Sequence, residues 1–425
     1  MKAFVASVPL FDSGLIVQAY SLCERSGDSV LDIAKGHSRM TNVFDSPGLD
    51  LIARLGPEPF AADVPLFVEV NRFQLLTGTP VKFNISPEKL VCVLPSDLPH
   101  EDSIVERLTS LQQAGYKLAY NGIPDEGLAN PLLQFFSYVV LDYDSHLFAT
   151  HYSGVKEGIP EVDIVVSGVP SMEVFTDLAA KNPRALFTGF FYNQPITQEV
   201  GEISPIKVNA LHLMRQVNEE DFDLLDVIKI IERDPSLSIS LMRFINSAAV
   251  KLERRVSSIG AAVAILGQQE IRRWAMVAIS VGLGEDRPVE ITRISLIRAK
   301  FAENLAGIFN LGVFQHVLFM IGLFSLLDVI LQKPMSEAIK EVAVNEEVGK
   351  TLVGRSGKFF PVMQLIYAYE HAEWDEANRI MIQNSVDLES VSGAFVDAII
   401  WYDQLLKAID DTDETGDAEP ETLSE

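Results

Sequence analysis

The pattern of hydrophobic and polar positions changes once along this chain, near residue 200. Before that point, apolar runs of four to six residues alternate with longer segments that mix polar and apolar side chains. The strand candidates are Phe4–Pro9, Leu15–Tyr20, Leu66–Val70, Leu90–Leu94, Lys117–Tyr120, Tyr138–Leu141, Asp163–Val166 and Leu186–Phe190. Eight strands with helices between most of them favour a (β/α) barrel over an open sheet.

The link between the first two strand candidates is very short. Only the turn around Asp12, Ser13 and Gly14 separates them. A crossover between parallel strands needs a dozen or more residues, so these two strands are predicted to be antiparallel.

After residue 202 the apolar positions recur at helical spacing. Leu237, Leu241 and Ile245 form one apolar stripe behind the helix-start signal Asp234-Pro235. The expected helices include 222–231, 235–246, 259–266 stopped at Gly267, 272–281, 294–309, 316–331, 362–371, 373–385 and 390–406. The run 316–331 is so apolar that it predicts a central buried helix. We therefore expect a barrel at residues 1–197, an all-α domain at 198–408 and a disordered tail at 409–425.

Charge separates the tail from the rest of the protein. The formal net charge is −25, and residues 410–425 contain eight acids and no base, which leaves −17 for the remainder. A segment of this composition is typical of a solvated, disordered end. The acidic balance argues against nucleic acid or an anionic membrane as a partner, because both require clustered cations.

Cysteine content and hydropathy give the expected compartment. Two cysteines, Cys23 and Cys92, cannot form a disulfide framework and are predicted to be buried free thiols. The longest apolar run, Val317–Leu327, has 11 residues, and a membrane-spanning helix needs about 20. The first residues lack the features of a signal peptide. These observations predict a soluble cytoplasmic protein.

Two sets of phrases resemble known families. LMRFINSA, SSIGAAVAILG and EIRRW together resemble the core of an HDOD domain, a relative of the HD phosphohydrolases. IVQAYSLCER, SLQQAGYKLAYNGI, YVVLD and LFTGFFYNQP resemble an EAL domain, a barrel that hydrolyses cyclic di-GMP and has a reversed first strand. The whole chain to about residue 408 is thus similar to two-domain EAL–HDOD signalling proteins of bacteria.

The EAL resemblance implies where metal ligands would lie. Active members hold two divalent cations with carboxylates and an Asn at the carboxyl ends of barrel strands. The matching positions here are Ser21-Leu22-Cys23, Val91–Leu94, Asn121-Gly122, Val140, Ser167–Pro170 and Thr188, with Asp142 and Gly189 retained. Asp142 and Asp163 alone cannot supply an oxygen-rich shell for two magnesium ions.

The HD resemblance leads to the same expectation for the helical domain. The family's His-Asp pair falls on Ser325-Leu326, and no His-Asp dipeptide occurs in the sequence. We therefore expect a degenerate barrel and a degenerate helical domain, no metal or cofactor, and no enzymatic activity. The predicted function is non-catalytic signal transduction through protein–protein interaction in a cyclic di-GMP-related pathway, such as motility or surface attachment. An alternative function is that of a cyclic di-GMP sensor, although dinucleotide binding is disfavoured. The oligomeric state is left open, and a homodimer is one possibility.

One basic group stands out in this acidic chain. Arg254, Arg255, Arg272 and Arg273 either pair with neighbouring acids or provide a docking site for an acidic partner segment. Asn246, at the end of its predicted helix, is interpreted as a structural residue whose amide binds nearby backbone.

Overall fold

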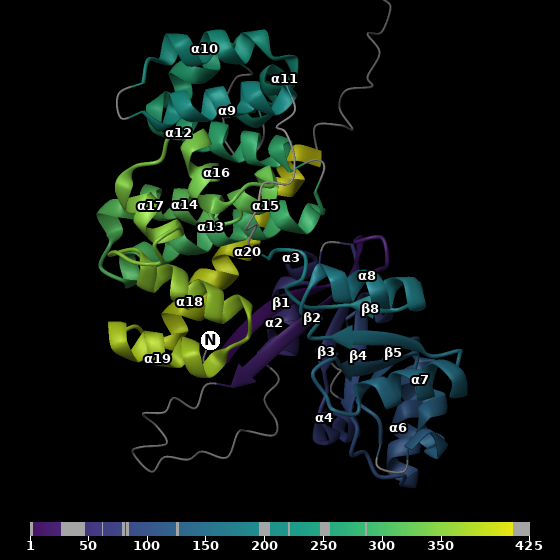
Figure 1. Cartoon of the computed structure of the whole chain (residues 1–425). Coiled ribbons are helices and arrows are strands. Elements are labelled where there is room, and N and C mark those ends of the chain that lie inside the picture. Colours follow the sequence, from purple (N-terminus) through teal and green to yellow (C-terminus); the bar gives the residue numbers. More distant parts are fainter. Residues whose placement is uncertain are drawn as a thin grey trace, which may run out of the picture. The chain divides into compact units, whose positions relative to one another are not determined.

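The computed structural model divides the chain into two compact units (Figure 1). It describes residues 3–26, 47–61, 63–78, 81, 85–124, 127–194, 205–219, 222–246, 256–284 and 287–410. The first unit contains Met1–Gln194 and Pro361–Phe395, and the second contains Pro195–Phe360 and Val396–Glu425. The expected boundaries near residues 197 and 408 remain predictions, and the compact units differ from them in placing Pro361–Phe395 with the barrel.

The first unit is built on a closed eight-stranded barrel in which the strands follow one another in chain order. The strands are β1 (Ala3–Phe11), β2 (Val17–Ser26), β3 (Leu66–Glu69), β4 (Leu90–Pro95), β5 (Lys117–Asn121), β6 (Tyr138–Asp142), β7 (Asp163–Ser167) and β8 (Leu186–Phe187). β1 is antiparallel to both of its neighbours, and all other pairs are parallel. The predicted barrel and its antiparallel first strand are both confirmed.

Side chains on one face of each strand fill the barrel. The buried cluster contains Leu10, Ala19, Phe67, Val91, Val93, Ala119 and Val165, with Tyr138, Val140 and Leu186 packed against it. Successive side chains alternate between the two faces of a strand, so every second residue from these positions also faces the barrel interior. Along the parallel strands, the last inward-facing positions lie at the carboxyl ends, and these ends form the barrel mouth.

Helices complete the barrel unit. Those between strands are α2 (Pro47–Leu55), α3 (Glu58–Ala61), α4 (Arg72–Thr77), α6 (Asp102–Gln113), α7 (Phe148–Gly158) and α8 (Met172–Lys181). The unit also includes most of α18 (Phe360–Glu370), α19 (Trp374–Asn384) and the start of α20 (Leu388–Asp410). Tyr369 of α18 accepts a hydrogen bond from the β1 backbone N–H of Val5 at 3.3 Å, and the His371 ring lies 3.8 Å from that of Phe190, centroid to centroid.

The described part of the second unit is helical. Its helices are α9 (Pro205–Asn218), α10 (Leu224–Arg233), α11 (Pro235–Asn246), α12 (Ile259–Leu283), α13 (Val289–Ile308), α14 (Gln315–Phe324), α15 (Leu327–Leu331), α16 (Met335–Glu341) and α17 (Glu346–Leu352), followed by the second part of α20. Asp234 caps α11 by accepting hydrogen bonds from the backbone N–H groups of Ser236 and Leu237. The predicted stripe of Leu237, Leu241 and Ile245 is buried.

The predicted helix stop at Gly267 is confirmed. α12 spans Ile259–Leu283, but Gly267 has non-helical dihedral angles (φ 70°, ψ −179°), so the chain kinks there between two helical segments. One helix prediction is wrong. The apolar run 316–331 is not one helix, because it breaks between α14 and α15 at Ser325-Leu326. Apolar periodicity indicates that the run is buried, but it does not indicate a local backbone break.

α13 and α14 pack unusually closely at Gly322. A Cβ atom at that residue would lie 2.5 Å from the carbonyl oxygen of Arg298 and 2.6 Å from Cα of Ala299. No helix in the described residues is long and apolar enough to cross a bilayer.

Candidate functional site

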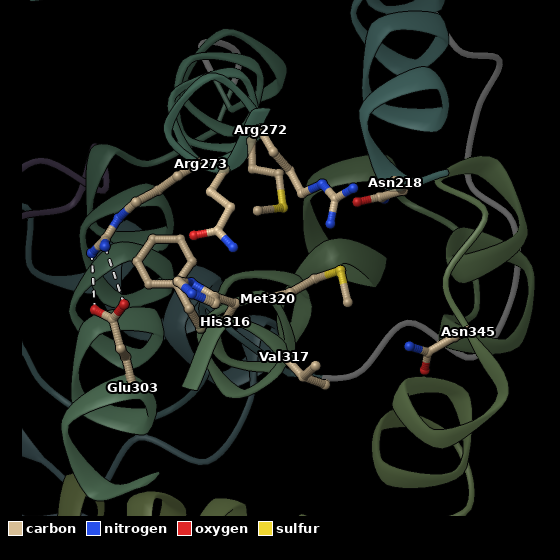
Figure 2. Close-up of a pocket in the computed structure, with 11 residues that line it drawn as sticks. Asn218, Arg272, Arg273, Glu303, His316, Val317, Met320 and Asn345 are labelled. Atoms are coloured by element: carbon tan, nitrogen blue, oxygen red, sulfur yellow. Dashed lines mark hydrogen bonds and ion pairs between the residues drawn. The ribbon is translucent and has the colours of Figure 1, made fainter. Parts of the chain in front are cut away.

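The second unit contains a cavity of about 360 Å³ with mixed chemistry (Figure 2). We call it the arginine pocket. Its lining consists of Asn218, Gln269, Arg272, Arg273, Met276, Glu303, His316, Val317, Phe319, Met320 and Asn345. These residues come from α9, α12, α13, α14 and the N-cap of α17. The volume is within the range of ligand sites in proteins.

Arg273 is held rigidly at one side of the pocket. Its two terminal nitrogens donate to the carboxylate of Glu303 at 3.1 and 2.9 Å, and Figure 2 shows this paired contact. The guanidinium also lies 4.6 Å from the ring centroid of Phe319 and 5.8 Å from that of Trp401. Lys300 donates to the same carboxylate at 2.7 Å. Bidentate pairing and ring stacking fix the plane of the guanidinium.

Arg272 lies across the pocket from that ion pair, beside Asn218 (Figure 2). It donates to the backbone carbonyl oxygen of Glu219 at 2.8 Å and stacks on the ring of Phe222 at 5.2 Å. Burial lowers the pKa of the Arg272 guanidinium through desolvation, but arginine remains protonated at neutral pH. The side chain therefore brings a poorly hydrated positive charge to the pocket.

The remaining lining combines apolar and amide groups. Met276 and Met320 both line the cavity, and thioethers adapt to irregular shapes. The amide nitrogen of Asn218 donates to the carbonyl oxygen of Val342 at 2.7 Å, while its buried amide oxygen has no hydrogen-bond partner. Asn345 caps α17 by accepting from the backbone N–H of Val348. This lining suits an anionic group attached to an apolar body.

The structure brings together two of the four predicted docking arginines. Arg272 and Arg273 both line the pocket, while Arg254 and Arg255 lie outside the described residues. Glu303, which pairs with Arg273, comes from a different helix and was not predicted as a site residue. The spacing of residues 269, 272, 273 and 276 is the i, i+3, i+4, i+7 pattern of one helix face and was a usable signal for the pocket.

The barrel mouth is a second candidate site. Its inward-facing polar positions, by strand alternation, are Ser21, Cys23, Glu69, Asn121, Asp142, Ser167 and Thr188. Glu69 was not predicted as a site residue, although it lies within the predicted strand Leu66–Val70. In the described residues, no three His, Cys, Asp or Glu side chains are placed to hold a metal ion together.

Burial controls the chemistry of several mouth residues. Burial, together with the nearby Glu69 charge, raises the pKa of the Cys23 thiol to about 11. Asp142 accepts a hydrogen bond from the backbone N–H of Asp144 at 3.1 Å. The Thr188 hydroxyl oxygen is buried without a hydrogen-bond partner. Cys23 and Cys92 are free thiols, as predicted, with Cys92 buried and Cys23 partly exposed.

Ser325, which matches half of the missing His-Asp pair, lies in a buried polar cluster. Its hydroxyl donates to the carbonyl oxygen of Gly322 at 2.6 Å and accepts from the guanidinium of Arg298 at 2.7 Å. Arg298 is 3% exposed and Asp328 is 4% exposed. Hydrogen bonding satisfies the serine and joins α13 to α14 at this point.

Comparisons with known proteins agree with this architecture. Residues 203–355 match the HDOD domain family. The chain is 26% identical over 419 residues to the uncharacterized protein YuxH of Bacillus subtilis, covering 96% of this chain and 100% of the relative. It is 22% identical over 414 residues to the cyclic di-GMP phosphodiesterase CdgJ of Vibrio cholerae, covering 96% of this chain and 94% of the relative.

Solved structures also match part of the chain. BlrP1 of Klebsiella pneumoniae, in a complex with calcium and cyclic di-GMP, is 16% identical with a TM-score of 0.33, covering 46% of this chain and 56% of BlrP1. The PaMucR phosphodiesterase in complex with c-di-GMP is 14% identical with a TM-score of 0.35, covering 46% of this chain and 97% of PaMucR. At such TM-scores the fold assignment rests on the strand topology of the chain itself.

These comparisons correct one expectation. The expectation that the chain has no enzymatic activity is contradicted, because a relative spanning 96% of it is named a cyclic di-GMP phosphodiesterase. The expectation that dinucleotide binding is disfavoured stays a prediction. The error came from judging the barrel by the residue types at matched positions, which is not a measurement of binding or turnover.

Proposed function

We propose that the helical unit of this chain transmits a cyclic di-GMP-related signal by binding a partner protein. The proposal is supported by the EAL-like barrel, the HDOD domain match and the relation to cyclic di-GMP signalling. The bound element is an acidic segment of the partner, and the pathway controls motility or surface attachment. The observation that carries this proposal is the arginine pocket, where Arg272 and Arg273 face an apolar floor in a chain of net charge −25.

The composition of the pocket favours a protein segment as its ligand. Arginine and aromatic side chains dominate the energetics of protein interfaces, and methionine adapts to partner side chains. Arg273 is pre-organised by Glu303 and Phe319, so binding would immobilise little additional side chain. A partner carboxylate would meet the desolvated charge of Arg272, while an adjacent apolar residue would contact Met276 and Met320.

The test compares the full chain with two pocket variants, Arg272→Gln and Arg273→Gln. Each protein is used to isolate partners from the native bacterium, and the binding of each purified partner is then measured by calorimetry. We expect each variant to lower the affinity about tenfold or more, because a charge-assisted hydrogen bond is lost.

The matched control is Arg184→Gln in the barrel unit, where Arg184 pairs with Asp163. This variant should bind the partner as the parent does. A purified partner that binds all four proteins equally would refute the arginine pocket as the docking site.

A second candidate function is recognition of cyclic di-GMP at the barrel mouth. The Thr188 hydroxyl, buried without a partner, and the carboxylates of Glu69 and Asp142 supply polar groups at the carboxyl ends of the strands, where barrel enzymes bind ligands. The relative CdgJ carries the name of a phosphodiesterase that acts on this dinucleotide.

Calorimetry on the full chain, with and without Mg²⁺ or Mn²⁺, tests this candidate, and product formation is followed in the same samples. We expect micromolar or tighter binding that weakens in Asp142→Ala and Glu69→Ala. Lys117→Ala, at the opposite end of β5, is the control. Absence of binding under all metal conditions would exclude the candidate.

A further inference from the structure

The arginine pocket contains a hydrogen-bond acceptor that the function proposed above does not use. Asn218 is the last residue of α9, and its amide nitrogen donates to the carbonyl oxygen of Val342 at 2.7 Å. That bond fixes which end of the amide is nitrogen and which is oxygen. Within the part of the chain that the structure describes, the amide oxygen is buried without a hydrogen-bond partner. Buried acceptors are almost always satisfied, so this oxygen requires a donor from water or from a ligand.

Asn345 brings a second amide of the opposite sense to the same pocket. Its amide oxygen accepts from the backbone N–H of Val348 at 3.0 Å, whereas its amide nitrogen donates to no group among the described residues. The side chain lines the cavity and belongs to an exposed residue. Figure 2 shows Asn218 and Asn345 on the side of the cavity away from the pair of Arg273 and Glu303. The pocket therefore presents one amide acceptor and one amide donor on this side.

The turn that leads to Asn345 is held against the end of α9. The guanidinium of Arg215 donates to the backbone carbonyl oxygen and to the carboxylate of Glu341, both at 2.6 Å. Lys333 pairs with the same carboxylate at 3.3 Å. Asn345 follows Val342 by three residues, which span at most about 11 Å. Four residues of an extended chain cover about 13 Å, so one short segment reaches both amides.

From this pair of amides, we propose that the arginine pocket binds the acidic segment of its partner in an extended conformation. One backbone N–H of the segment donates to Oδ1 of Asn218, and one backbone carbonyl oxygen accepts from Nδ2 of Asn345. The inference rests on the proposed function and specifies the conformation of the ligand.

The alternative of a helical partner segment does not fit the two amides. In a helix the backbone N–H and C=O groups are paired with each other, except at the ends, so the body of the helix offers nothing to either asparagine. An extended segment has unpaired backbone groups along its edge, and these give affinity without depending on sequence. Its side chains remain available for Arg272 and for the apolar lining.

The test uses a positional-scanning library of acetylated hexapeptide amides in which one residue is fixed as glutamate and the others vary. The full-length parent and the Arg272→Gln variant are screened, and the tightest peptide that requires Arg272 is selected. Each backbone amide of that peptide is then replaced in turn by an ester, which removes one N–H and leaves the side chains unchanged. We expect one ester to lower the affinity about fivefold in calorimetry, because the hydrogen bond to Asn218 is lost.

Protein variants assign that hydrogen bond to the pocket. In Asn218→Leu the same ester should have no further effect, since the acceptor is already absent, and such a cycle isolates the paired contribution. Asn345→Ser keeps a capping side chain at the start of α17 but removes the amide nitrogen, and it should weaken the unmodified peptide about fivefold. The matched control is Asn71→Ser at the N-cap of α4 in the barrel unit, which should bind as the parent does. The ester series on the parent decides the question even if Asn218→Leu fails to fold.

The outcomes separate this inference from the proposed function. A peptide that requires Arg272 but tolerates every ester would overturn the extended binding mode and leave the docking function intact. A helical bound peptide, detected by transferred nuclear Overhauser effects, would do the same. An ester that weakens binding to the parent but not to Asn218→Leu supports both. If no peptide distinguishes the parent from Arg272→Gln, the docking function fails, and this inference fails with it.

Discussion

At the scale of single residues, the structure shows why Asn246 follows the predicted stripe of α11. Its amide nitrogen donates to the carbonyl oxygens of Met242 and Val256 at 2.9 and 3.0 Å, and its amide oxygen accepts from the N–H of Val256 at 2.7 Å. The predicted structural role is confirmed. The side chain ties the end of α11 to the segment that leads into α12.

The change Asn246→Ala should therefore destabilise the helical unit. Two backbone groups of Val256 and one of Met242 lose their partner, and we expect a loss of about 2 kcal/mol in the free energy of unfolding. Asn384→Ala, which removes a single bond to Ile380, is a control with a smaller effect. Urea denaturation measures both, and equal stability of the Asn246 variant and the parent would contradict the role.

Tyr369 predicts a pH dependence in the barrel unit. Burial raises the pKa of its phenol to about 12, opposed by hydrogen bonds from the Val5 backbone and with Ser392. The folded state therefore disfavours the phenolate, so this contribution to stability is intact below pH 10 and decreases as pH rises from 10 through 12.

We expect Tyr369→Phe to flatten the alkaline decline of unfolding free energy by up to about 1.4 kcal/mol per pH unit, the contribution of one proton. At pH 8 the variant should lose about 1 kcal/mol, because Val5 loses its acceptor. Urea titrations between pH 8 and 11 test both effects, with Tyr143→Phe as the control. An unchanged alkaline slope would contradict the burial argument.

At the scale of elements, local patterns explain the successful predictions. The strand runs and the apolar stripe of α11 are patterns of residues that lie close together in the sequence, so they could be predicted from it. The break at Gly267 was predicted from the glycine itself, and the helical segment at 272–281 was predicted from its apolar residues. The arginine pocket could not be predicted as a unit, since Asn218, Arg273 and Glu303 come from three helices that meet only in space.

The close packing of α13 on α14 gives a prediction at this scale. Gly322→Ala places Cβ against the backbone of Arg298 and Ala299, so the helices must separate, and we expect a loss of about 1 to 3 kcal/mol. Gly307→Ala in α13 meets nothing within 4 Å and should stabilise by roughly 0.5 to 1 kcal/mol. Thermal melts of the two variants should shift in opposite directions, and shifts of the same sign would contradict the packing argument.

At the scale of the whole molecule, the barrel unit is discontinuous in sequence. The barrel comes from the first 194 residues, and Pro361–Phe395 completes the unit. The aromatic rings of Tyr369, Trp374 and Phe395 form a buried cluster in this segment, with centroid distances of 5.4 and 4.8 Å from Tyr369. No local pattern could have predicted that this segment joins the barrel unit, because the hydrogen bond between Val5 and Tyr369 joins residues 364 positions apart.

Residues 1–197 expressed alone should therefore be less stable than the same segment joined to residues 361–395 by a flexible linker. The isolated segment exposes the faces of β1 and Phe190 that Tyr369 and His371 contact. Limited proteolysis and thermal melts would measure the difference. If both proteins resist protease equally, the C-terminal segment is dispensable to the barrel.

This discontinuity also has a consequence during synthesis on the ribosome. About 200 residues separate the last barrel strand from the end of the segment that completes the unit. At about 5 to 20 residues per second, translation takes roughly 10 to 40 s to deliver that segment. During that time the apolar surface of the nascent barrel stays uncovered. Slow codons in the second half of the message, or chaperone binding to the nascent chain, would therefore determine the yield of folded barrel.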